Sequence, residues 1–92
     1  MSASGGATEA GVDKVRRVID AGAAEVYIVG SAAALSAVHE KTLRFLQNNG
    51  FASLGPGERF GCPRLPERFA VFTTKSPPVH LYESSSVRVV YV

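Results

Sequence analysis

The sequence predicts an α/β fold, a two-layer sandwich in which two helices pack on a small mixed sheet. Three observations support this prediction. Residues 9–21 and 32–49 repeat apolar side chains with the period of a helix. Residues 26–29 form a β-branched and aromatic run between those helices, and residues 69–92 are rich in strand-forming residues. The resulting order is helix, strand, helix and then further strands.

The length of 92 residues suits one domain with one modest core. Residues 1–8 are small and polar, so we expect a disordered tail there and a single domain over residues 9–92. No run approaches the roughly 18 apolar residues of a membrane span. The single cysteine, Cys62, excludes an internal disulfide and indicates a reducing, intracellular location, either cytoplasmic or nuclear.

The first predicted helix runs from Glu9 to Ala21, because its valines and Ile19 recur on one helical face. A strand over residues 26–29 follows, and Gly30 ends it. Ser31 is placed to cap the second helix. That helix should end at Gly50 in the left-handed C′ position, with Phe51 folding back on the last turn.

Residues 52–66 contain six glycines and prolines and are predicted to form a long irregular loop. From Phe69 the apolar residues alternate with period two, which predicts a strand over residues 69–74. Residues 75–78 break the pattern. Residues 79–83 and 87–92 then read as two strands joined by three serines, a predicted hairpin.

Net charge is +2, and the positive excess lies in residues 51–92. Basic residues beside aromatic ones can hold a nucleic-acid strand by charge and stacking. The candidate set on the loop and strands is Arg64, Arg68, Lys75 and Arg88, interleaved with Phe60, Phe69, Tyr82 and Tyr91. Because those aromatic residues alternate along strands, a core position is the competing interpretation.

Two further groups could contact phosphate. The Gly30–Ser31 turn opens a helix directly after a strand, where free backbone N–H groups can receive an anion. Lys14 and Arg17 lie on the first helix, where they could contact a phosphate backbone. The simpler alternatives are a plain N-cap for the turn and a solvated helix face for the cluster.

No catalytic arrangement can be assembled from these residues, so we expect neither an enzyme nor a protein with a metal site or cofactor. Cys62 lies in a loop rich in proline and glycine, and the two histidines, His39 and His80, are far apart in sequence. No glycine-rich nucleotide motif is present.

Three segments resemble the Alba family of small nucleic-acid-binding proteins: residues 22–28 (GAAEVYI), residues 34–38 and 45–51 (ALSAV and FLQNNGF), and the closing residues 86–92 (SVRVVYV). The resemblance covers about two-thirds of the chain. It implies a β-α-β-α-β-β domain that dimerises and binds RNA or DNA through its strand-to-helix turns and an extended hairpin. In this sequence the family's first strand is not found, and the turn at residues 30–34 lacks the family's basic residues.

The function predicted is sequence-tolerant binding of RNA, ahead of DNA, by a homodimer or by one subunit of a ribonucleoprotein with a related hetero-partner. The alternative is a non-enzymatic interaction or assembly subunit that keeps the fold but does not bind nucleic acid. The balanced charge of residues 1–50 favours the alternative, and the basic, aromatic second half favours nucleic-acid binding.

Overall fold

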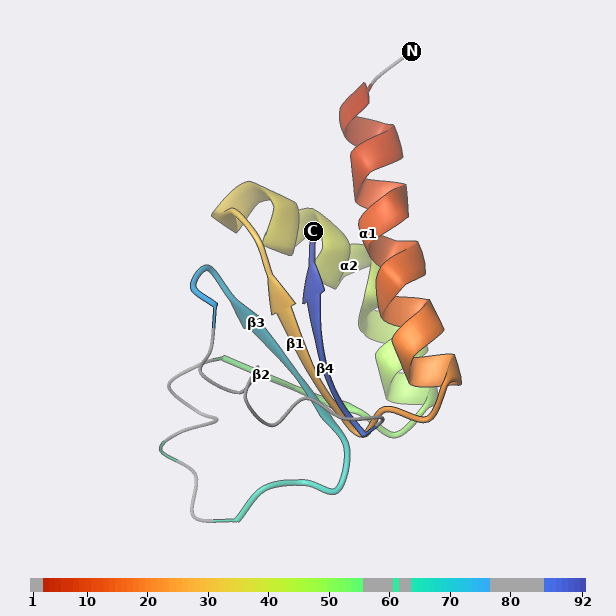
Figure 1. Ribbon diagram of the computed structural model, residues 1–92, viewed down its shortest axis with the longest axis vertical. Helices are drawn as coiled ribbons and strands as arrows, with labels where there is room; N and C mark the ends of the chain where they lie inside the picture. Colours follow the sequence, from red (N-terminus) through yellow and green to blue (C-terminus); the bar gives the residue numbers. More distant parts are fainter. Residues whose placement is uncertain (1–2, 56–60, 62–63, 77–85) are drawn as a thin grey trace.

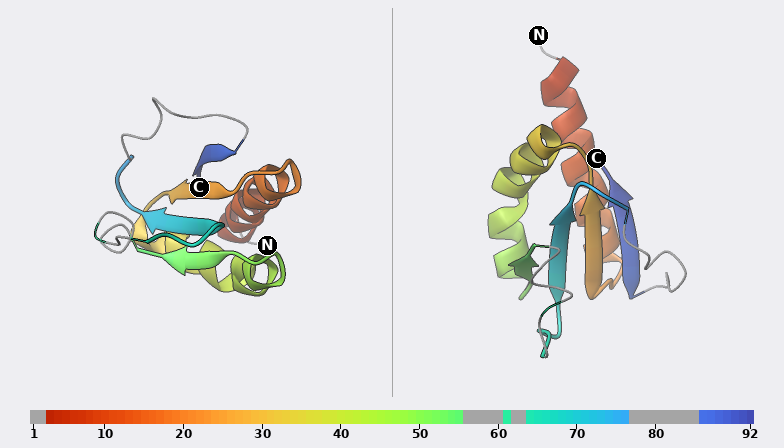
Figure 2. Two further views of the ribbon diagram at one scale, coloured as in Figure 1. Left: turned by 90° about the horizontal axis from the view of Figure 1, so that it is seen from below. Right: turned by 90° about the vertical axis from the view of Figure 1, so that its left-hand side faces the viewer.

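A computed structural model describes residues 3–55, 61, 64–76 and 86–92, with side chains from Glu9 onward. Two helices pack on one face of a four-stranded sheet (Figure 1; Figure 2). The elements in chain order are α1 (Ala3–Asp20), β1 (Glu25–Val29), α2 (Ala32–Asn48), β2 (Ala52–Leu54), β3 (Phe69–Thr73) and β4 (Val87–Tyr91). The predicted α/β class and the two-helix layer are confirmed.

The strand order is β2-β3-β1-β4, and every neighbouring pair is parallel. The predicted mixed sheet is therefore wrong. Helix α2 carries the chain back along the sheet, so β2 starts at the same end as β1, as a crossover connection requires. The unbroken apolar run of β1 fits a central strand that is buried on both faces of a parallel sheet.

Within the described residues, the last strand does not pair as an arm of the predicted hairpin. β4 lies parallel to β1, with Val87 opposite Glu25 and Tyr91 opposite Val29. The other predicted arm, residues 79–83, lies outside the described residues. Period-two alternation indicates a strand but does not specify its direction, which is why the sequence pattern suggested a local antiparallel pair.

Both ends of α2 form as predicted. The Ser31 side chain accepts a hydrogen bond from the backbone N–H of Ala34 at 3.2 Å, so Ser31 is the N-cap. Gly50 has a φ of 75°, and the Phe51 N–H donates to the Leu46 carbonyl at 2.8 Å. This is a Schellman motif, in which the carbonyls of the last turn are satisfied while Phe51 is buried in the core.

Helix α1 begins at Ala3, six residues before the predicted start at Glu9. The disordered tail expected over residues 1–8 stays a prediction. The helix ends at Asp20, one residue before the predicted end at Ala21, and Gly22 follows in the left-handed region with a φ of 104°. Among the described residues no helix is both long and apolar enough to cross a membrane.

The core lies on both faces of the sheet. Between sheet and helices, α1, α2 and the central strands bury an aliphatic cluster that includes Val15, Ile28 and Leu46. On the opposite face Tyr27 and Phe69 are buried with Val71. Full burial of such side chains contributes about 1.5–3 kcal/mol each, so the central strands β1 and β3 hold the two layers together.

Strand β2 was not predicted, because residues 52–66 were expected to be irregular. It is only three residues long, and its Ala52 N–H donates to the Arg68 carbonyl at 3.0 Å. A short edge strand of the composition Ala-Ser-Leu shows no alternation that a sequence pattern could reveal.

Candidate nucleic-acid interface

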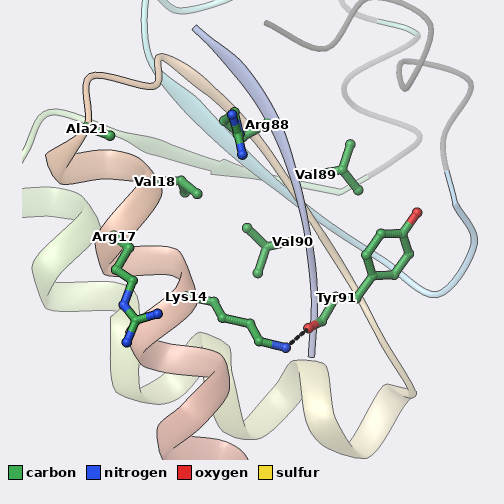
Figure 3. Close-up of a pocket in the computed structure, with 8 residues that line it drawn as sticks. All are labelled: Lys14, Arg17, Val18, Ala21, Arg88, Val89, Val90 and Tyr91. Atoms are coloured by element: carbon green, nitrogen blue, oxygen red, sulfur yellow. Dashed lines mark hydrogen bonds between the residues drawn. The ribbon is translucent and has the colours of Figure 1, made fainter. Parts of the chain in front are cut away.

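A cavity of about 510 Å³ lies between α1 and the outermost strand β4 (Figure 3). We call it the α1–β4 groove. It is lined by Lys14, Arg17, Val18, Ala21, Arg88, Val89, Val90 and Tyr91. These eight residues comprise three cations, one tyrosine and four apolar residues, with no acidic side chain among them. The groove is therefore suited to an anionic ligand.

The helical wall of the groove follows from residue spacing. Lys14, Arg17 and Val18 stand at positions i, i+3 and i+4 and share one face of α1, and Ala21 follows at i+7, directly after the helix ends at Asp20. Figure 3 shows Val18 on α1 and Val90 on β4 between the two elements, with Lys14 extending from the helix toward β4. The Arg17 guanidinium lies along α1 in the same view.

The strand wall is formed by alternate side chains of β4. Arg88 and Val90 point toward the helix side of the sheet, whereas Val89 and Tyr91 point the other way (Figure 3). The groove therefore follows the outer edge of β4 instead of lying on one face of the sheet.

Lys14 connects the two walls directly. Its Nζ donates a hydrogen bond to the Tyr91 carbonyl oxygen at 3.0 Å. The next residue, Val92, donates its N–H to the Val29 carbonyl at 2.8 Å, so the backbone groups of Val92 turn toward β1. Because these groups alternate in direction along a strand, the Tyr91 carbonyl turns away from β1, and Lys14 satisfies it.

Tyr91 is the aromatic side chain available for stacking in the described part of the predicted patch. It is 53% exposed, and its hydroxyl lies 3.2 Å from Ser76 Oγ. Phe69 is only 4% exposed and packs in the core, which confirms the competing interpretation for that residue. Phe60 and Tyr82 lie outside the described residues.

The Gly30–Ser31 turn and Lys75 share the carboxyl end of the sheet. The Ser31 oxygen is occupied by the cap of α2, which confirms the N-cap interpretation. A Cβ added to Gly30 would stand 2.9 Å from the Val92 carbonyl oxygen, so the chain packs closely at this turn. Lys75 is exposed just after β3, where Thr73 Oγ1 accepts a bond from its backbone N–H.

Arg64 and Arg68 lie at the opposite, amino end of β3. Arg68 Nη1 donates to the Asn49 carbonyl at 3.3 Å, and both arginines are exposed. The five residues of β3 span roughly 16 Å at about 3.3 Å per residue. The predicted set of Arg64, Arg68, Lys75 and Arg88 is thus divided among three regions, whereas Arg88 joins Lys14 and Arg17 in the groove.

The groove contains residues that sequence reasoning did not assign to a site. In the sequence, Val18, Ala21, Val89 and Val90 carry no functional signal. Their role as the apolar lining depends on β4 lying beside α1, which no local pattern reveals. The sequence signal was confined to the charged and aromatic residues of the groove, because Lys14, Arg17, Arg88 and Tyr91 were candidates from their residue types.

His39, the histidine within the described residues, contacts side chains of the neighbouring strands β2 and β3. Its Nε2 lies 3.2 Å from Ser53 Oγ, and its ring meets the Phe72 ring edge-on with centroids 4.8 Å apart. Cys62 and His80 lie outside the described residues. Within the described segments, no group of three histidine, cysteine, aspartate or glutamate side chains is placed to hold a metal ion.

Comparisons of the chain with protein-family models, curated proteins and solved structures found no match. Function is therefore inferred from the residues of the α1–β4 groove and from their geometry.

Proposed function

We propose that this chain binds nucleic acid, RNA ahead of DNA, through the α1–β4 groove and without sequence preference. The observation that carries the proposal is the meeting of Lys14, Arg17 and Arg88 on one concave surface beside the exposed Tyr91. Basic side chains supply the affinity for phosphate, and an exposed aromatic ring supplies stacking. The resemblance to the Alba family is a second support.

A single strand fits this arrangement better than a duplex does. Bases of a single strand are free to stack on an aromatic ring or a guanidinium plane, whereas those of a duplex are already paired. Stacking tolerates any base, and contacts to phosphate carry no sequence information. The predicted consequence is binding that depends on salt concentration but little on base sequence.

We propose further that the protein acts in an intracellular compartment, as a homodimer or together with a related partner chain. β4 is the last strand at one end of the sheet, and the three-residue β2 is the last at the other. Outer strands favour association with further chains. A second copy would double the number of cations available to one nucleic-acid strand, which raises avidity.

The decisive experiment is a salt titration with fluorescently labelled single-stranded RNA. Two triple variants carry the same charge change: Lys14→Gln/Arg17→Gln/Arg88→Gln in the groove, and Arg64→Gln/Arg68→Gln/Lys75→Gln elsewhere. Loss of three phosphate contacts should lower the log–log salt slope by about 2, since each contact contributes about 0.7 for single strands. The groove variant should show this loss, and the control should keep most of the wild-type slope.

Circular dichroism of both variants tests whether they remain folded. Equal loss in the two triples would show that binding follows net charge and not the groove. Absence of binding by the wild-type chain at low salt, to single-stranded and duplex nucleic acid alike, would refute the proposal. The alternative, a non-enzymatic interaction or assembly subunit, would then take its place.

A further inference from the structure

We infer that the α1–β4 groove recognises a nucleotide that carries a terminal phosphate, such as the phosphorylated end of a strand. The inference rests on the proposed function and makes it more specific. It separates two ways of binding a strand: along its internal phosphodiesters, or at one end where a phosphomonoester is present.

The volume of the α1–β4 groove suits one nucleotide. The groove encloses about 510 Å³, within the range of roughly 300–1,000 Å³ typical of sites for one small ligand. It is bounded by α1 on one side and by the five-residue strand β4 on the other. Such a cavity accommodates one nucleotide unit, so a bound strand would place a single nucleotide inside it.

The positive charge of the groove suits a phosphomonoester better than a phosphodiester. An internal phosphodiester carries one negative charge, whereas a phosphomonoester carries about 1.5–2 at neutral pH and has three acceptor oxygens. Three cations line one cavity, and none of the described residues that line it is acidic. That excess of positive charge matches a terminal phosphate better than a single diester.

The Lys14 ammonium group is held in position to bind phosphate. An ammonium group has three N–H donors, and the bond to the Tyr91 carbonyl at 3.0 Å uses one of them. The remaining donors can meet phosphate oxygens while the backbone of β4 holds the ammonium in place. A donor that is already positioned loses less conformational entropy on binding.

The apolar lining of the groove can contact the base and the sugar of a nucleotide. Val18 and Val90 lie between the two walls, and Tyr91 stands at the edge of the groove (Figure 3). Val90 is only 5% exposed and forms the floor, so the partly buried Val18 and the 53% exposed Tyr91 at the edge offer the surface for the base and the sugar. Inorganic phosphate lacks both parts, so it should bind more weakly than a nucleotide.

The test uses one short oligouridine in three forms: with a 5′-phosphate, with a 3′-phosphate, and with hydroxyl groups at both ends. Anisotropy at a fixed salt concentration gives the three affinities. We expect one phosphorylated form to bind at least about tenfold more tightly than the hydroxyl form, because charge-assisted bonds to a second phosphate charge are added. Uridine monophosphate should compete with that form, and uridine and inorganic phosphate should compete more weakly.

Variants locate the effect. Lys14→Met keeps the length of the side chain but removes the charge, and it should reduce the tenfold gain to near unity. Lys14→Arg should restore part of the gain, and Arg68→Met, at the amino end of β3, should leave it unchanged. Methyl NMR signals of Val18 and Val90 should shift on addition of uridine monophosphate.

The outcomes distinguish this inference from the proposed function. Equal affinity for the phosphorylated and hydroxyl forms would overturn the inference and leave the proposed function standing. A phosphate-dependent gain that persists in a folded Lys14→Met variant, without shifts at Val18 and Val90, would also overturn it. If no form binds at low salt, both proposals fail.

Discussion

The Nζ atom of Lys14 and the carbonyl oxygen of Tyr91 form a 3.0 Å hydrogen bond between residues 77 positions apart in the chain. One partner lies in the middle of α1, and the other is the last residue of β4. The bond satisfies an outward-facing carbonyl of the sheet and holds a cation beside it. A single contact thus joins the stability of the sheet edge to the charge of the proposed binding groove.

The first prediction concerns close packing between Gly11 and Val92. A Cβ added at Gly11 would stand 2.9 Å from Val92 Cγ1, closer than real side chains allow. Alanine in a helix is favoured over glycine by roughly 0.5–1 kcal/mol, but overpacking costs about 1–3 kcal/mol. We expect Gly11→Ala to lower the free energy of unfolding by about 1 kcal/mol, measured by chemical denaturation.

The background variant Val92→Ala provides the control. Removal of Cγ1 relieves the closest contact and leaves Val92 Cβ and Val38 Cγ2 at 3.1 Å, so Gly11→Ala should cost less in that background. Gly30→Ala should stay destabilising there, because a Cβ at Gly30 also meets the Val92 backbone oxygen at 2.9 Å. An effect of Gly11→Ala that is the same in both backgrounds would contradict the packing argument.

The second prediction concerns Gly50, which ends α2 with a φ of 75°. A Cβ at this position would meet nothing within 4 Å, so the strain on substitution comes from the backbone alone. Gly50→Val should lower the free energy of unfolding by on the order of 1 kcal/mol or more. Gly50→Asn should cost less, because asparagine tolerates the left-handed region. Equal costs in thermal denaturation would contradict this account.

Sequence reasoning was accurate where local rules dominate. The cap at Ser31, the left-handed Gly50 and the return of Phe51 each depend on contacts within a few residues, and all are confirmed. The strands predicted over residues 26–29, 69–74 and 87–92 match β1, β3 and β4 to within one residue at each end, because β-branched and aromatic residues concentrate in them.

Sequence reasoning failed where distant segments decide the structure. The parallel direction of β4 depends on its pairing with β1, and its own residues would suit an antiparallel strand equally well. The grouping of Lys14 with Arg88 follows from that pairing, since it brings β4 beside α1. The predicted basic patch was divided for the same reason. Arg68 and Lys75 are close in the sequence but lie at opposite ends of β3.

The third prediction is self-association. The sheet ends in β4 on one side and in the short β2 on the other, and Leu43 and Tyr91 are large hydrophobic residues on the surface of the described chain. We expect a homodimer in sedimentation velocity experiments at micromolar concentrations, or a monomer that associates when RNA is added. A monomer at high micromolar concentration, with and without RNA, would contradict the proposal for this chain alone.

The last prediction concerns stacking on Tyr91, whose ring is 53% exposed. Stacking of a base on an aromatic ring contributes about 1–3 kcal/mol, so Tyr91→Ala should weaken RNA binding by roughly 5- to 150-fold. Tyr91→Phe keeps the ring and loses only the hydroxyl that lies near Ser76, so its affinity should stay close to wild type. Both variants retain the backbone carbonyl that accepts the bond from Lys14, so the position of the ammonium should not change. Fluorescence anisotropy with oligouridine measures these affinities, and an unaltered salt slope in Tyr91→Ala would show that only stacking was removed. If Tyr91→Phe loses as much affinity as Tyr91→Ala, the hydroxyl and not the ring is the group that contacts RNA.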